Sequence, residues 1–218
     1  MPFRSYLASM SVVVLATNNN PRLLNPDFLK RNGIVPEEWV HVDVLVTPPY
    51  AQTVFDNGVT IQMLENRFTV DVSVPDKFSG WVDEVPLIVI KFLKTLPHVD
   101  YRAVGMNFVF SSAKPMEGDA ENQLIASMLK EGTWMEQLGG LSGTEIELRY
   151  RNGQPQYNVK VGVKESLGKA EGPKEYVVIV NVHHDFEGTQ GDERARFIQT
   201  LSEVFSAAQA VVSKLPLE

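Results

Sequence analysis

The stretch YAQTVFDNGVTIQML, residues 50–64, decides the fold class of this chain. At its centre, Asp56-Asn57-Gly58 holds an Asn-Gly pair, which favours the tight turn of a β-hairpin because both residues tolerate a positive φ. The residues on either side, 50–55 and 59–64, include the β-branched and aromatic types that strands prefer. The sequence therefore predicts two antiparallel strands here, and with them an antiparallel sheet.

Three further strands are predicted around this hairpin. Residues 11–17, SVVVLAT, are a β-branched run that ends in the loop-forming sequence NNNP. Residues 41–47 and 68–74 alternate between apolar and polar side chains, which is typical of strands with one buried face. In residues 41–47 this alternation assigns the valines at 42, 44 and 46 to the buried face and leaves His41 and Asp43 on the polar one.

Two helices are predicted in the same half of the chain. The first is short: Asn25 caps it, Pro26 lies in its first turn and Gly33 ends it. The second carries an apolar stripe over residues 85–96, with Asp83 as the expected N-cap. This longer helix and the long helix at the end of the chain are expected to cover the apolar face of the sheet.

The second half repeats this order of elements. Residues 101–110 predict a strand, and Asp119 is the expected cap of a helix. A second hairpin is predicted around Arg151-Asn152-Gly153. A strand over residues 175–184 then leads into one last helix, whose apolar stripe runs over residues 197–215.

We therefore predict an α+β fold that forms a single domain over residues 1–218. Two pseudo-repeated strand-helix-hairpin-strand-helix halves, at about residues 11–98 and 99–215, are expected to form a largely antiparallel curved sheet with helices on one face. In element order this layout resembles the saddle-shaped TATA-box-binding architecture, in which two such halves share one curved sheet. The resemblance is one of element order, and no function is carried over from it.

Composition and charge disfavour several classes of partner. The net charge of −7 repels polyanions. The polar face of the predicted sheet also lacks the stacked aromatics and interleaved basic residues of nucleic-acid-binding sheets. We therefore expect no nucleic-acid partner. No run of 18 apolar residues occurs, so no membrane span is expected either.

The chain contains no cysteine, which excludes thiolate nucleophiles and cysteine-ligated metals. This agrees with a reducing compartment, and the apolar run over residues 10–16 is read as a strand rather than a signal peptide. We therefore expect a cytoplasmic protein. None of the phosphate-loop, dinucleotide-binding or zinc-protease motifs is present, so no cofactor is expected.

The candidate site is NVHHDFEG, residues 181–188, which holds two of the four histidines. Neighbouring strand residues point to opposite faces, so His183 shares a face with Asp185 and His184 lies on the other. His183, Asp185 and, from another strand, His41 are the candidate catalytic residues. His183 and Asp185 are also the candidate metal ligands, although metal sites usually take three or more. A solvated strand end is the alternative interpretation.

We favour a non-catalytic soluble interaction or scaffold protein, which acts as a homodimer or with a protein partner. Two alternatives stay open. One is a small-molecule-binding protein or enzyme with a pocket between sheet and helices, lined near His41, His183 and Asp185. The other is a metal-dependent hydrolase that uses the strand end of residues 181–188. An exposed Trp134 would indicate an interface.

Overall fold

The computed structural model describes residues 3–73, 75–113, 116, 118–129, 143–150, 153–165, 174–186 and 191–217. The strands are β1 (Ser5–Thr17), β2 (His41–Val46), β3 (Tyr50–Phe55), β4 (Val59–Leu64), β5 (Arg67–Val72), β6 (Asp100–Ser112), β7 (Glu145–Tyr150), β8 (Gln156–Glu165) and β9 (Lys174–Asp185). The helices are η1 (Pro21–Leu23), α1 (Pro26–Arg31), η2 (Pro75–Lys77), α2 (Trp81–Thr95), α3 (Ala120–Met128), α4 (Gly191–Gln199) and α5 (Leu201–Val212).

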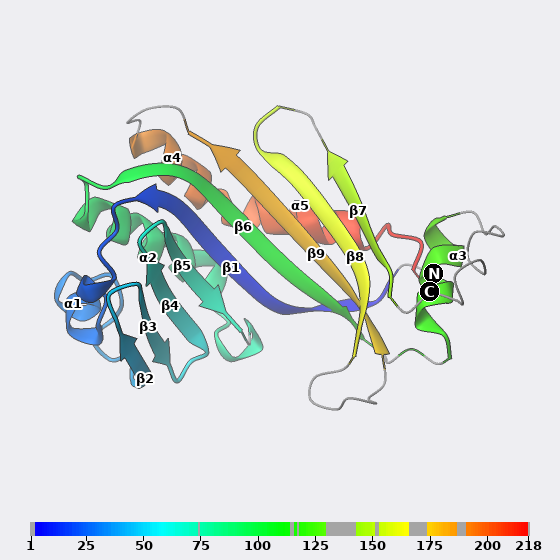
Figure 1. The fold of residues 1–218 in the computed structure, drawn as a ribbon, viewed down its shortest axis with the longest axis horizontal. Coiled ribbons are helices and arrows are strands. Elements are labelled where there is room, and N and C mark those ends of the chain that lie inside the picture. Colours follow the sequence, from blue (N-terminus) through cyan, green and yellow to red (C-terminus); the bar gives the residue numbers. More distant parts are fainter. Residues whose placement is uncertain are drawn as a thin grey trace.

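All strands of the described residues belong to one nine-stranded sheet (Figure 1). Its order is β2-β3-β4-β5-β1-β6-β9-β8-β7, and each pair of neighbours is antiparallel. The α+β class and the antiparallel sheet predicted from the sequence are therefore confirmed. Among the described residues, no helix is both long enough and apolar enough to cross a membrane.

The predicted hairpin joins β3 to β4. Gly58 adopts a φ of +86°, which glycine reaches without strain, and its N–H donates to the carbonyl of Phe55 at 3.2 Å. The Asn57 side chain accepts a hydrogen bond from the Val59 N–H at 3.1 Å. Alternate residues of both strands are buried, so each strand turns one face to the core.

The centre of the sheet is the long pair β1 and β6. Each strand has 13 residues, and the pairing runs from Ser5 opposite Ser112 to Thr17 opposite Asp100. The strand predicted over residues 11–17 is thus present but starts six residues earlier, at Ser5. The earlier start follows from tertiary pairing, because Tyr6 and Leu7 lie opposite residues of β6.

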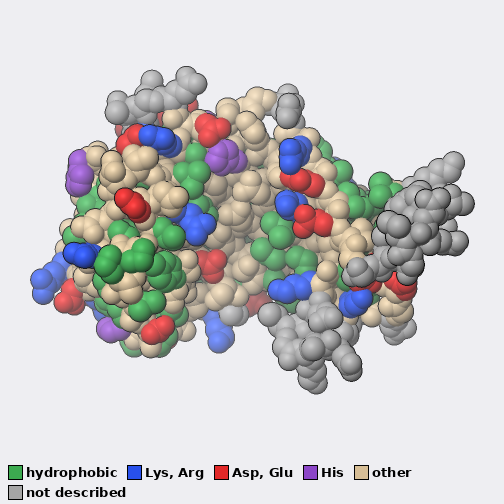
Figure 2. Space-filling view, viewed as in Figure 1, with side chains coloured by type: hydrophobic (Ala, Val, Ile, Leu, Met, Phe, Trp, Pro, Cys, Tyr) green, Lys and Arg blue, Asp and Glu red, His purple; other side chains and the backbone are tan. Residues whose placement is uncertain are grey.

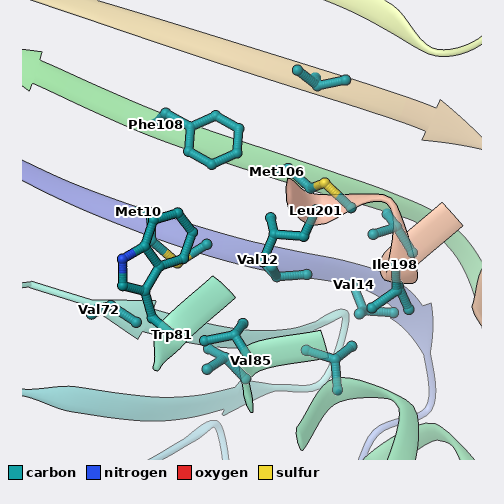
Figure 3. Close-up of a cluster of buried hydrophobic side chains, with 14 of the residues drawn as sticks. Met10, Val12, Val14, Val72, Trp81, Val85, Met106, Phe108, Ile198 and Leu201 are labelled. Atoms are coloured by element: carbon teal, nitrogen blue, oxygen red, sulfur yellow. The ribbon is translucent and has the colours of Figure 1, made fainter. Parts of the chain in front are cut away.

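The core lies on the side of the sheet that α2, α4 and α5 cover (Figure 1). In Figure 3, Trp81 and Val85 of α2 and Ile198 and Leu201 of α4 and α5 lie among the apolar side chains of β1 and β6. The ring of Phe205 on α5 contacts Trp81 at 4.9 Å and Phe108 of β6 at 5.4 Å between centroids. Helices that are about 100 residues apart in the sequence therefore share one core.

The helix caps agree only in part with the sequence pattern. Asn25 caps α1 by accepting from the Phe28 N–H at 2.9 Å, and Asp119 caps α3, both as predicted. Helix α2 begins at Trp81 with Gly80 as its N-cap, so Asp83 lies inside the first turn and is not the cap. An acidic residue is favourable there because of the helix dipole.

The last helix is two helices, not one. Thr200 separates α4 from α5: its N–H and its hydroxyl both donate to the carbonyl of Phe197, at 3.0 and 2.7 Å. A hydroxyl that bonds a nearby carbonyl competes with regular helical pairing, which explains the break. The predicted turn residues Arg151 and Asn152, the continuation of the helix after residue 129, and Trp134 lie outside the described residues.

Candidate functional site

The predicted His183–Asp185 contact is present at the end of β9. The Nε2 atom of His183 lies 2.9 Å from Oδ1 of Asp185, on the face of the sheet opposite the one on which the neighbouring Val182 is buried. The Asp185 side chain is 58% exposed, so the pair meets bulk solvent. Its catalytic or metal-binding role stays a prediction.

His41 lies far from this pair. Five strands separate β2 from β9 in the sheet, and at a spacing of about 4.8 Å the two strands are about 29 Å apart. A bulge after His41 also turns its side chain to the face of its cross-strand neighbour Phe55, which is buried in the core, so its predicted position on the polar face is wrong. Among the described residues, no three histidine, aspartate or glutamate side chains are grouped as a metal would require.

His184 points to the helix side, as the strand alternation predicted. Its ring stacks on Phe186 at 4.3 Å and meets the edge of Phe197 at 4.8 Å. Nε2 lies 4.0 Å from Oε1 of Glu193, and the buried Nδ1 has no hydrogen-bond partner among the described residues. His184 helps to line a pocket of about 410 Å³ with Tyr157 and the α4 side chains. Sequence reasoning passed over His184 in favour of His183, although the alternation already placed it near the helices.

A second pocket, of about 540 Å³, lies between the end of α2, the start of β6 and α4. Leu93 and Val99 are among its apolar lining residues, and its charged lining residues are Lys94, Arg194, Asp100 and Asp192. The Tyr101 hydroxyl donates to the Leu96 carbonyl at 3.0 Å. Burial raises the pKa of this phenol, and the nearby Arg194 opposes the rise. Both pockets lie between sheet and helices, but neither is lined by His41, His183 or Asp185.

The other face of the sheet is polar and is open to the viewer in Figure 2. A row of side chains crosses its centre: Asn107 Nδ2 donates to Ser11 Oγ at 3.1 Å, and Asn181 Nδ2 donates to Asn107 Oδ1 at 2.6 Å. These amides hold one another in place, so the centre of the open face is ordered before anything binds to it.

Two carboxylates on the same face have shifted pKa values. Hydrogen bonds from Arg149 and Asn158 lower the pKa of Glu147 to about 2. Asp71, opposite Ser11 in the register, has its pKa raised by burial. Neither carboxylate lies beside the His183–Asp185 pair, since β7 and β5 are on either side of the central strands.

The most unusual surface is the edge strand β2. All six of its residues are exposed, with Val42 at 62% and Leu45 at 47%. Figure 2 shows hydrophobic side chains gathered at the corner where β2 and β3 lie in Figure 1. The prediction that its valines would be buried is therefore wrong. Val44 and Val46 do face the helix side, opposite the buried Thr53 and Ala51, but the edge strand extends past the helices.

Comparison of the sequence with models of protein families and with curated proteins gave no match.

Proposed function

We propose that this chain is a non-catalytic interaction protein that binds its partner along the exposed edge of β2. One observation carries the proposal: β2 ends the sheet, and all six of its residues are exposed, most of them apolar. An edge strand presents unpaired N–H and C=O groups, and an extended partner segment that pairs with them gains main-chain hydrogen bonds. The apolar side chains then add burial to this pairing.

The two edges of the sheet differ in a way that supports this choice. Strand β7 at the opposite edge reads EIELRY and carries three charged residues, with Glu147 bonded to Arg149 at 2.9 Å. Charged residues on an edge are a common defence against unwanted pairing. Strand β2 reads HVDVLV and has Asp43 as its one acidic residue. The edge of β2 is therefore the better one for accepting a partner.

The wider architecture belongs to the same proposal. We propose that the two halves are a pseudo-repeat with helices on one face, built outward from β1 and β6. Its support is the strand order, in which β5-β4-β3-β2 extend from β1 and β9-β8-β7 extend from β6. In this arrangement the second strand of each half, β2 or β7, is an edge of the sheet, and only the first half leaves that edge apolar.

Site-specific photocrosslinking in cells tests the proposal. A benzophenone side chain in place of Leu45 should yield a discrete crosslinked product, and Val44→Lys in the same chain should reduce its yield at least tenfold. The control position is Tyr150 on β7, which is 46% exposed. Equal yields from the two edges, or a yield at Leu45 that Val44→Lys leaves unchanged, would contradict the proposal.

The pocket of about 540 Å³ supports a second candidate, a small-molecule-binding protein or enzyme. Its volume lies within the range of about 300–1,000 Å³ that is usual for ligand sites. Native mass spectrometry under gentle desolvation should then show extra mass that is lost on denaturation and is reduced by Arg194→Met. Spectra recorded with and without a chelator test the metal-dependent hydrolase, for which His183→Ala should abolish any bound metal.

A further inference from the structure

We propose that the segment which pairs with β2 is β2 of a second copy of this chain, in a twofold-symmetric antiparallel dimer that joins two sheets into one. This inference rests on the proposed function and names its partner. One register of such a pair satisfies three features of β2 together: the directions of its backbone groups, the placement of its side chains and its one negative charge.

The backbone directions of β2 follow from its hairpin with β3. The Thr47 N–H donates to the Tyr50 carbonyl at 2.8 Å, so these two residues form a hydrogen-bonded pair. Hydrogen-bonded and non-hydrogen-bonded pairs alternate along an antiparallel ladder. Leu45 and Asp43 therefore direct their N–H and C=O groups toward β3, opposite Gln52 and Val54. Val44 and Val46 direct theirs outward, to the free edge.

A twofold axis at Leu45 uses both outward residues. Val44 then exchanges hydrogen bonds with Val46 of the partner subunit, and Val46 with the partner's Val44. The two Leu45 side chains meet across the axis on the open face, while the four valines form a cluster on the helix side. In this geometry both helix layers lie on the same side of the joined sheet. The helix-side residues Val44 and Val46 of β2 are themselves exposed, so the helices leave this edge open.

The charge on β2 and its bulge disfavour the neighbouring registers. An axis at Asp43 would place the two carboxylates directly opposite each other, which is destabilising. An axis at Val44 would set Val46 opposite the partner's Val42, and Val42 lies in the bulge and has no regular place in the ladder. With the axis at Leu45, Asp43 lies opposite Thr47 of the partner subunit, which is uncharged, so no two carboxylates face each other.

The area of the contact sets the expected affinity. Stable complexes bury about 800 Å² on each partner, and a pair of six-residue strands buries less. The net charge of −7 on each copy also opposes long-range approach. We therefore expect a dimer that forms and dissociates reversibly, with a Kd on the order of 10 µM. Higher salt should tighten it, because screening weakens the repulsion between the two copies.

Leu45→Cys is the first test, since the natural chain has no cysteine to interfere. In the proposed register the two Cα atoms at position 45 form a non-hydrogen-bonded pair about 4.5 Å apart, within the range that a disulfide can bridge. We expect mild oxidation to convert most of this variant to a covalent dimer. The control is Leu87→Cys on α2, which is 53% exposed and reports random collision.

Sedimentation velocity is the second test. The unmodified protein should show a concentration-dependent dimer, and Val44→Lys should raise its Kd at least tenfold. Val44 is exposed in the single chain. At low protein concentration, the thermal unfolding midpoint of Val44→Lys should therefore equal that of the unmodified protein.

Two outcomes separate this inference from the proposed function. A protein that stays monomeric at several hundred micromolar, with no more crosslinking at position 45 than at 87, overturns the dimer. If photocrosslinking at Leu45 then captures a different protein in a Val44-dependent way, the interaction function stands without the dimer. If neither occurs, both proposals fail.

Discussion

At the scale of single residues, the open face holds two carboxylates whose pKa values move in opposite directions. Glu147 lies at the surface, and hydrogen bonds from Arg149 and Asn158 stabilise its charged form. Asp71 is partly buried among the central strands, and loss of hydration disfavours its charged form. The two residues should therefore give opposite pH dependences of folding stability.

Glu147→Gln tests the first of these effects. The pKa of Glu147 is lowered from 4.5 to about 2 by folding, so its contribution is fully present above pH 4.5 and is lost as the pH falls toward 2. We expect wild type to exceed Glu147→Gln in unfolding free energy at pH 6, and the difference to vanish near pH 2. Urea unfolding across this pH range measures it. Glu145→Gln on the same strand is the control, and a difference that is independent of pH would contradict the assignment.

Asp71→Asn tests the second effect. Because folding raises the pKa of Asp71, the protonated form is the one that the folded state prefers. The contribution of Asp71 to folding stability is present below its unfolded pKa near 3.8 and is lost as the pH rises through its folded pKa. Asparagine imitates the protonated acid, so Asp71→Asn should stabilise the fold at pH 7 and have little effect at pH 3. Thermal unfolding at the two pH values measures this difference. A lower unfolding midpoint for Asp71→Asn than for wild type at pH 7 would show that burial does not raise the pKa of Asp71.

At the scale of elements, the cap of α1 offers the most direct test. This helix has six residues, and the Asn25 side chain satisfies the N–H of Phe28 at 2.9 Å. Asn25→Ala leaves that N–H without its partner and should cost about 1 kcal/mol of unfolding free energy. Asn25→Asp keeps the acceptor and is the matched control. Chemical denaturation measures both, and equal losses for the two variants would show that the cap bond is not what stabilises the helix.

These elements also show which features of the fold could be predicted from the sequence. The Asn-Gly turn, the two strands beside it and the Asn25 cap are local signals, and the structure confirms each of them. The exposure of β2 could not be predicted, because its alternation is that of a buried strand. Which strand reaches past the helices depends on the order of the whole sheet. The break between α4 and α5 at Thr200 could not be predicted either, because the apolar stripe in the sequence continues through it.

The candidate site shows the same limit. Strand alternation correctly separated His183 from His184, since their side chains lie on opposite faces. It could not place His41, because the distance between strands depends on the topology of the sheet and its facing depends on a bulge. Both pockets likewise arise from packing between elements distant in sequence, for which no short motif exists.

At the scale of the whole molecule, the two halves are joined by backbone pairing and by side chains. Strands β1 and β6 pair along almost their full length at the centre of the sheet. Above them, Trp81 from the first half meets Phe205 from the second at 4.9 Å. A half separated from its partner would expose a long central strand and one side of this shared core. The halves should therefore unfold together.

A variant with Trp81→Phe and Trp134→Phe, which keeps Trp39 as its only tryptophan and leaves an aromatic ring opposite Phe205, tests this cooperativity, because Trp39 packs on Phe55 and Phe78 within the first half. We expect its fluorescence and the far-ultraviolet circular dichroism of the whole chain to follow one denaturation curve. Phe205→Ala, made in the second half, removes a large ring from the shared core and should lower the unfolding free energy by about 3 kcal/mol. Both probes should shift together. A Trp39 transition that stays in place while the dichroism curve moves would mean that the halves are separate folding units, with the β1–β6 pair contributing little to the stability of either.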